Sequence, residues 1–241
     1  MKTIVFLGSK NIGYECLKHL YDNQNNLNFK LIGVLTNNRG KKVTQYCKEK
    51  SISMINGLNE FLDIDYCDIA ISVQYHMILK KQHIKKAKEI FVNLHMAPLP
   101  EYRGCNQFSF SIINGDKRFG TTIHRLEEGI DSGAIMFDKR FPIPQDCWVE
   151  ELYQITFDKS VELFKESLPH LVSGNYQLNP QKLFLDKRTT SIHFRKEIEE
   201  IKKIDLSWNK DKIERQIRAT YMPGFDPPFI IINNEKINFK K

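Results

Sequence analysis

The sequence predicts an α/β protein with a Rossmann-like, mostly parallel sheet, helices on both faces, and a small C-terminal extension of a helix plus a β-hairpin. Two observations predict this fold. Short apolar runs alternate with amphipathic segments through the first half of the chain. Such runs are typical of parallel strands buried on both faces, which need crossover helices between them. The 241 residues suffice for one domain and a modest addition.

Four strands and three helices are expected in the first half of the chain. The run 3–7 is continuously apolar and ends at Gly8, as a buried strand does. The helix that follows it places a single apolar stripe on one face, from Ile12 to Tyr21. The expected strands are 3–7, 30–36, 68–73 and 90–94, and the expected helices are 11–22, 39–50 and 80–88.

The pattern changes after about residue 115. Two strands, 121–128 and 134–143, flank the turn GIDSG, so they should pair antiparallel at one edge of the sheet. A long amphipathic helix is expected over 149–172, with Gly174 as its C-terminal glycine. We therefore predict a catalytic domain over 1–175 and an extension over 176–241.

The extension is expected to form a homodimer. Its last segment, FIIINNEKINF, predicts a hairpin in which Asn233-Asn234 supplies the left-handed turn. An isolated hairpin is marginal in water, and its edge invites pairing. Trp208, Ile213 and Ile217 add an apolar stripe to an otherwise charged helix. A hairpin that folds back on its own domain is the alternative.

Composition narrows the class of partner. The 36 basic and 29 acidic residues give a net charge of +7, which suits an anionic partner such as a phosphate ester, a nucleic acid or a membrane surface. The sequence contains no apolar run of 18 residues, which a membrane-spanning helix would need. The N-terminal apolar run is too short for a signal peptide, so a cytoplasmic protein is expected. The five cysteines and seven histidines show no metal-ligand spacing, so no metal is expected.

The loop GSKNIG (8–13) joins the first strand to the first helix. Backbone amides at a helix N-terminus bind anions, and Ser9 and Lys10 would lie at the carboxyl end of the strand, where open α/β sheets bind ligands. The loop lacks the three-glycine dinucleotide fingerprint. A plain strand-to-helix turn is the alternative interpretation.

Asn93, His95 and Asp131 are the candidate catalytic residues. Asn93 and His95 are two apart at the end of an apolar strand, so their side chains share one face. An amide and an imidazole aimed together into a crevice indicate function more strongly than either alone. Asp131 lies in a glycine-flanked turn, where an aspartate usually caps its own backbone.

Together these segments resemble the folate-dependent formyltransferases. The resemblance rests on Asn93-x-His95, then Leu99-Pro-x-Tyr-Arg-Gly, then His124-x-Leu-x4-Asp131-x-Gly133-x-Ile135, and it covers roughly residues 1–175. Within that family, the segment NLHMAPLPEYRGCNQ and the compact tail are most similar to the nucleotide-sugar N-formyltransferases.

The resemblance implies formyl transfer from 10-formyltetrahydrofolate to an amine, with an Asn-His-Asp catalytic set. His95 would carry the proton, since the reference pKa of histidine is about 6.5. Asn93 would donate a hydrogen bond to the developing oxyanion. Asp131 would either orient His95 or assist the leaving nitrogen. The folate-side residues that it implies lie in the loop 72–81 and near Asp131: Tyr75, Met77, Ile78, Leu79, Leu126 and Ile130.

The acceptor expected from this resemblance is a dTDP-linked amino sugar, specifically dTDP-4-amino-4,6-dideoxyglucose, for surface polysaccharide (O-antigen) synthesis. Ser9, Lys10 and Arg103 are candidate contacts to its pyrophosphate, although Arg103 equally fits a structural pair with a carboxylate. Gln107 and Tyr221 are candidate contacts to the sugar or the base.

Three alternatives remain open. A methionyl-tRNA formyltransferase would share the catalytic set, but members of that kind carry a C-terminal β-barrel domain for which the tail is too short. A glycinamide ribonucleotide formyltransferase would end soon after the long helix. A non-catalytic basic module would bind nucleotides or nucleic acid through the lysines at 39–50 and 80–88, but aromatic interleaving is missing there. We therefore expect neither a nucleic-acid nor a membrane partner.

Overall fold

The computed structural model describes residues 1–239, and its central feature is a six-stranded sheet in the order β2-β1-β3-β4-β6-β7. The first four strands are parallel, and β6 and β7 add an antiparallel edge. This confirms the predicted α/β class with its mostly parallel sheet. The sheet strands are β1 (Lys2–Gly8), β2 (Phe29–Leu35), β3 (Cys67–Val73), β4 (Ala87–His95), β6 (Arg118–Arg125) and β7 (Ile135–Pro142).

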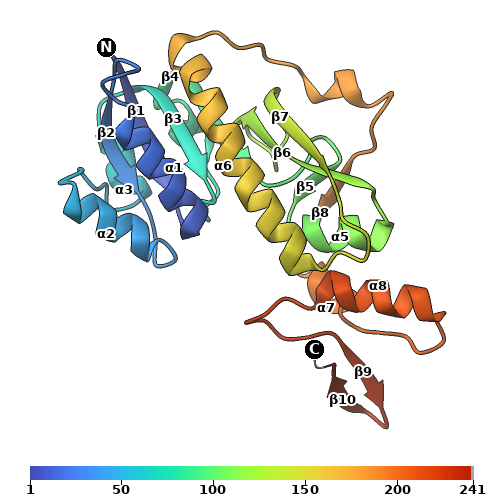
Figure 1. The fold of residues 1–241 in the computed structure, drawn as a ribbon. Coiled ribbons are helices and arrows are strands. Elements are labelled where there is room, and N and C mark those ends of the chain that lie inside the picture. The colour runs from blue at the N-terminus through green and yellow to red at the C-terminus, as the bar shows by residue number, and fades with distance from the viewer. Residues whose placement is uncertain (240–241) are drawn as a thin grey trace.

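Helices cover both faces of the sheet, as predicted (Figure 1). On β1, Ile4 and Phe6 pack into one hydrophobic cluster with α1 and α6, and Val5 and Leu7 pack into a second one with α3. This alternation follows from the two-residue period of a strand. The helices of this part are α1 (Lys10–Asp22), α2 (Lys41–Glu49), α3 (Leu58–Asp63), α4 (Lys81–Ile84), α5 (Gln107–Asn114) and α6 (Val149–Ser173).

The helix expected over 80–88 is wrong in extent. Only Lys81–Ile84 is helical, and β4 already begins at Ala87, where it pairs with Cys67 of β3. The lysine-rich sequence favours a helix locally, but hydrogen bonding to β3 extends the strand over these residues. The short helix α3 was not predicted, because its six residues are too few to establish a helical period in the sequence.

The segment 102–104, which follows the prolyl loop after β4, is extended. Tyr102–Gly104 forms the short strand β5, which pairs in parallel with β8 (Ser191–His193) of the extension. Helix α5 starts only at Gln107, after Asn106 in the left-handed region (φ 58°). The carbonyl of His193 lies so close to Gly104 that an added Cβ would sit 2.3 Å from it, so this pairing requires glycine.

The C-terminal elements match the predicted helix and hairpin. Gly174 ends α6 with φ 81°, and Asn233 and Asn234 turn the hairpin with φ values of 50° and 65°. Figure 1 shows the chain after α6 running back along the molecule to β8 before it reaches α8 and the hairpin. The division at residue 175 stays a prediction. The remaining elements are η1 (Gln181–Phe184), α7 (Glu197–Ile201), α8 (Lys210–Thr220), β9 (Phe229–Ile232) and β10 (Glu235–Asn238).

No helix within residues 1–239 combines the length and apolar character that a membrane span requires.

Candidate active site

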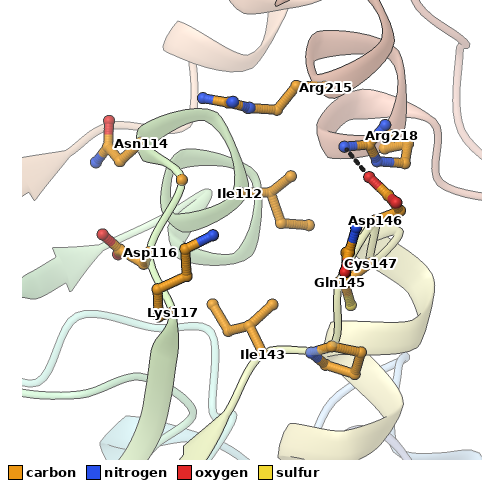
Figure 2. Close-up of a pocket in the computed structure, with 12 residues that line it drawn as sticks. Ile112, Asn114, Asp116, Lys117, Ile143, Gln145, Asp146, Cys147, Arg215 and Arg218 are labelled. Carbon is orange, nitrogen blue, oxygen red and sulfur yellow. Dashed lines mark ion pairs between the residues drawn. The ribbon is translucent and has the colours of Figure 1, made fainter. Parts of the chain in front are cut away.

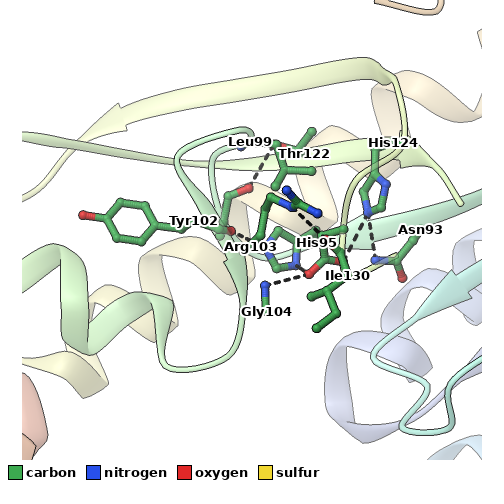
Figure 3. A network of polar contacts seen from close by, with 12 residues as sticks. Asn93, His95, Leu99, Tyr102, Arg103, Gly104, Thr122, His124 and Ile130 are labelled. Atoms are coloured by element: carbon green, nitrogen blue, oxygen red, sulfur yellow. Dashed lines mark hydrogen bonds and ion pairs between the residues drawn. The ribbon is translucent and has the colours of Figure 1, made fainter. Parts of the chain in front are cut away.

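The candidate site lies at the carboxyl end of β4, where the parallel part of the sheet meets its antiparallel edge. Asn93 and His95 occupy the end of β4, and Asn93 is paired across the ladder with His124 of β6. Directly paired residues of antiparallel strands point to the same face. Asp131 reaches the same place from the β6–β7 connection. Figure 3 shows Asn93 and His95 together with His124.

His95 is held in a defined tautomer. Its Nε2 lies 2.8 Å from the carbonyl oxygen of Tyr102, and since a carbonyl only accepts, Nε2 carries the proton. The basic position of the neutral ring is therefore Nδ1, which lies 3.6 Å from Oδ2 of Asp131. The hydroxyl of Thr121 donates to the carbonyl of His95 (3.1 Å) and fixes the backbone. The buried ring thus offers one nitrogen to a proton, beside a carboxylate.

Asp131 is an anion in this site. Burial alone would raise the pKa of its carboxyl, but the positive charge that the facing His95 and His124 rings carry when protonated, together with the backbone N–H of Gly104 (2.9 Å), holds that pKa well below its ordinary value. The backbone of Asp131 is left-handed (φ 44°), which is uncommon for a residue other than glycine. Gln181 holds this turn by donating to the carbonyls of Asp131 (2.7 Å) and Gly133 (2.9 Å).

His124 is a fourth member of the site that the sequence analysis used only as part of a motif. Its Nδ1–H donates to the carbonyl of Arg125 (2.9 Å), so Nε2 of the neutral ring accepts from the Asn93 amide (3.2 Å). The same Nε2 lies 3.5 Å from Oδ1 of Asp131. One hydrogen of the Asn93 amide is thereby engaged, and the amide is oriented with its second hydrogen available. The available signal in the sequence was a histidine within the predicted strand 121–128, next to the turn that carries Asp131.

The residues expected on the folate side fall into two groups. Tyr75, Leu79 and Leu126 pack into the same hydrophobic cluster, so the loop after β3 and the loop after β6 lie against one another. The other three, Met77, Ile78 and Ile130, are exposed apolar side chains (48%, 87% and 43%). Such a surface beside a polar site fits a flat, largely apolar ring system.

The five residues expected on the acceptor side do not all converge. Ser9 and Lys10 lie after β1, and the ammonium group of Lys10 donates to Gln74 (2.9 Å). Arg103 donates from Nε to the carbonyl of Ile130 (2.8 Å), so it belongs to the loop around Asp131. Gln107 is buried in the first turn of α5. Tyr221 packs edge-on against Trp148 at the start of α6.

A separate cavity of about 590 Å³ lies between α5, α8 and the β7–α6 connection (Figure 2). Its lining includes Lys117, Arg215 and the ion pair of Arg218 with Asp146 (3.1 Å), but none of the predicted catalytic residues. The predicted catalytic residues therefore lie outside this cavity. Within residues 1–239, no group of three or more histidine, cysteine or acidic side chains is arranged to hold a metal ion.

Comparison with known proteins gives a family. Residues 1–168 match the formyl transferase family. A GDP-perosamine N-formyltransferase of Brucella melitensis biotype 1 is 29% identical over 168 residues, which are 70% of this chain and 62% of that protein. A methionyl-tRNA formyltransferase of Lactobacillus gasseri is 28% identical over 91% of this chain and 72% of its own length. The chain spans less than two thirds of the first curated relatives that it matches.

Solved structures agree along the whole chain. The crystal structure of WlaRD, a sugar 3N-formyl transferase, in the presence of dTDP and 5-N-formyl-THF, is 26% identical and covers 98% of this chain and 85% of its own, with a TM-score of 0.81. A 4-N formyltransferase from Francisella tularensis, 17% identical, shares the fold over 100% of this chain and 98% of its own, with a TM-score of 0.78. The family match covers residues 1–168, which include the four side chains that meet at the end of β4: Asn93, His95, His124 and Asp131. The chain therefore belongs to the formyl transferase family.

Proposed function

We propose that this protein transfers the formyl group of 10-formyltetrahydrofolate to the amino group of a nucleotide-linked amino sugar. The observation that carries the proposal is the meeting of Asn93, His95 and Asp131 at the end of β4, in a chain of the formyl transferase family. In the reaction a bond forms between the amine nitrogen and the formyl carbon, the bond from that carbon to N10 of the folate breaks, and one proton moves from the amine to the folate nitrogen.

In the proposed reaction each of these residues has a separate part. The folate supplies the formyl carbon and the leaving nitrogen. Nδ1 of His95 is the basic nitrogen of the site, and the Asp131 carboxylate beside it stabilises the imidazolium that forms when Nδ1 takes a proton. The free hydrogen of the Asn93 amide is placed to donate to the formyl oxygen as negative charge develops there.

The folate is proposed to bind between the loop after β3 and the loop that carries Asp131. Met77, Ile78 and Ile130 offer exposed apolar surface for the pterin ring, and Tyr75, Leu79 and Leu126 support these loops from beneath. The WlaRD structure, a formyltransferase of similar fold obtained in the presence of 5-N-formyl-THF, supports a folate co-substrate.

The finer proposal for the acceptor is dTDP-4-amino-4,6-dideoxyglucose, used to build a surface polysaccharide. Support for the dTDP nucleotide comes from WlaRD, whose structure was obtained in the presence of dTDP and covers 98% of this chain; its name, sugar 3N-formyl transferase, assigns transfer to a 3-amino group. The GDP-perosamine enzyme supports the acceptor class, and its name assigns a different nucleotide.

An acceptor screen tests the proposal. The purified protein is mixed with 10-formyltetrahydrofolate and, in turn, dTDP-4-amino-4,6-dideoxyglucose, its 3-amino isomer, GDP-perosamine and methionyl-tRNA. Formylated product is detected by mass spectrometry. Transfer to one or more nucleotide sugars supports the proposal, and transfer to methionyl-tRNA alone would replace it with the second family activity represented among the relatives.

A homodimer formed through the C-terminal hairpin belongs to the same proposal. Phe225, Ile231, Ile232 and Ile237 remain exposed (72%, 44%, 43% and 46%) on and beside the β9–β10 hairpin. A two-fold interface with a second copy of this chain would bury this face on both subunits at once.

A further inference from the structure

Three cations from separate segments gather at the carboxyl ends of β1, β2 and β3. Lys10 follows β1, Arg39 follows β2, and Arg195 belongs to the extension. Burial lowers the pKa of the Lys10 ammonium group, and the neighbouring guanidinium groups of Arg39 and Arg195 lower it further. Like charges repel, so such a gathering opposes folding unless an anion joins it.

Hydrogen bonds hold the segments that carry these cations. The backbone N–H of Lys10 donates to the carbonyl of Arg39 (3.1 Å), which joins the loops after β1 and β2. The side chain of Asn106 donates to the carbonyl of Phe194 (2.9 Å), next to Arg195, and ties the extension to the loop after β5. Lys10 itself is left-handed (φ 59°), a conformation that glycine or asparagine adopts at less cost than lysine.

The same place holds hydrogen-bonding groups without partners. Within residues 1–239, none of the three cations is paired with a carboxylate. The hydroxyls of Ser9 and Thr36 are buried and have no hydrogen-bond partner, and Ser9 is the N-cap residue of the 13-residue helix α1. A helix N-terminus carries partial positive charge and free N–H groups. A Cβ on Gly40 would lie 1.9 Å from Oγ1 of Thr36, so glycine keeps this corner open.

We propose that Lys10, Arg39 and Arg195, with the hydroxyls of Ser9 and Thr36, form the site that binds the diphosphate of the acceptor. The assignment rests on the proposed function and specifies it: a residue of the C-terminal extension takes part in acceptor binding. Cys105 lies near the ammonium group of Lys10 and directly follows Gly104, whose N–H holds the Asp131 carboxylate. Arg195 follows β8, which pairs with β5 as far as Gly104, so a diphosphate bound here lies beside the segment that holds the catalytic carboxylate.

Isothermal titration of the full chain with dTDP and with inorganic pyrophosphate tests this site. Arg195→Gln and Arg39→Gln each remove one charge from an exposed side chain, so neither disturbs the core. Arg215→Gln is the matched control, because it removes the same charge from an exposed position on α8. We expect each site variant to bind both ligands about tenfold more weakly or worse, and the control to bind like the wild type. Folinic acid, titrated in parallel, should bind all four proteins equally.

The outcomes separate this site from the proposed function. Unchanged dTDP and pyrophosphate affinity in both site variants would overturn the site while leaving the function standing. Weaker folinic acid binding with unchanged dTDP binding would assign the cations to the folate carboxylates and also overturn it. An equal loss of dTDP and pyrophosphate affinity in Arg215→Gln would show that the total charge of the protein causes the effect, and would also overturn the site. If the wild type bound pyrophosphate but not dTDP, and Arg195→Gln lost that binding, the site would stand and the dTDP assignment would fail.

Discussion

Replacing Asp131 by asparagine removes the charge that faces His95 and little else. Asparagine has almost the same shape, and its side-chain oxygen still accepts the N–H of Gly104, which lies 2.9 Å from the carboxylate. The separation between Oδ2 of Asp131 and Nδ1 of His95 is 3.6 Å. At an effective dielectric constant of 20, Coulomb's law gives 332/(20 × 3.6), or roughly 4.6 kcal/mol, for the attraction between the carboxylate and a protonated His95.

Most of that attraction is lost from the transition state, in which His95 is charged. A loss of about 4 kcal/mol corresponds to roughly a thousandfold lower kcat. Single-turnover formyl transfer from 10-formyltetrahydrofolate, quenched and followed by mass spectrometry, measures the effect directly. Circular dichroism and the Tm serve as the control for folding. A well-folded Asp131→Asn protein with kcat within tenfold of the wild type would show that the Asp131 charge does not stabilise protonated His95 in the transition state.

Four further predictions follow from the same structure. His95→Asn should lower kcat by orders of magnitude with an unchanged Tm, and near wild-type turnover would remove His95 from the mechanism. Gln181→Leu frees the turn that carries Asp131 and should lower kcat about tenfold with little change in KM; a change confined to KM would speak against this positioning role. Because the pKa of Asp131 is lowered in the fold, its contribution to the free energy of unfolding is full above about pH 4 and is lost as the pH falls further. Urea titrations between pH 5 and pH 2.5 should therefore show a steeper loss for the wild type than for Asp131→Asn. Light scattering should give about twice 28.3 kDa for the wild type and a smaller mass for Ile232→Asp, whereas a fully active wild-type monomer would contradict the dimer.

The alternation of apolar strands and amphipathic helices was enough to predict the α/β class, because buried parallel strands leave a strong pattern. The common direction of Asn93 and His95 followed from the two-residue period of a strand. The meeting of Asp131 with His95 did not follow from spacing, since 36 positions separate them; only the resemblance to a family suggested it. In the structure β6 pairs antiparallel with β4, and the connection after β6 brings Asp131 to the end of β4.

What the sequence could not predict depends on backbone hydrogen bonds. Strands β5 and β8 are three residues long and show no period, so neither their pairing nor the nearness of Arg195 to Lys10 could be foreseen. Gln181 donates to backbone carbonyl groups, which every residue carries. The side chains of its partners therefore give no sign of this contact in the sequence. The extension was predicted as a dimerisation element, but its first part also lines the catalytic loops.

The residues at the end of β4 are proposed to move a formyl group from folate to an amino sugar. The most direct measurement uses 10-formyltetrahydrofolate labelled with ¹³C in the formyl group and dTDP-4-amino-4,6-dideoxyglucose, with the product followed by ¹³C NMR. We expect the label to appear as an N-formyl carbon on the sugar with the wild type and about a thousandfold more slowly with Asp131→Asn. Label that stays on the folate with every nucleotide sugar tested, or that moves at the same rate with both proteins, would contradict it.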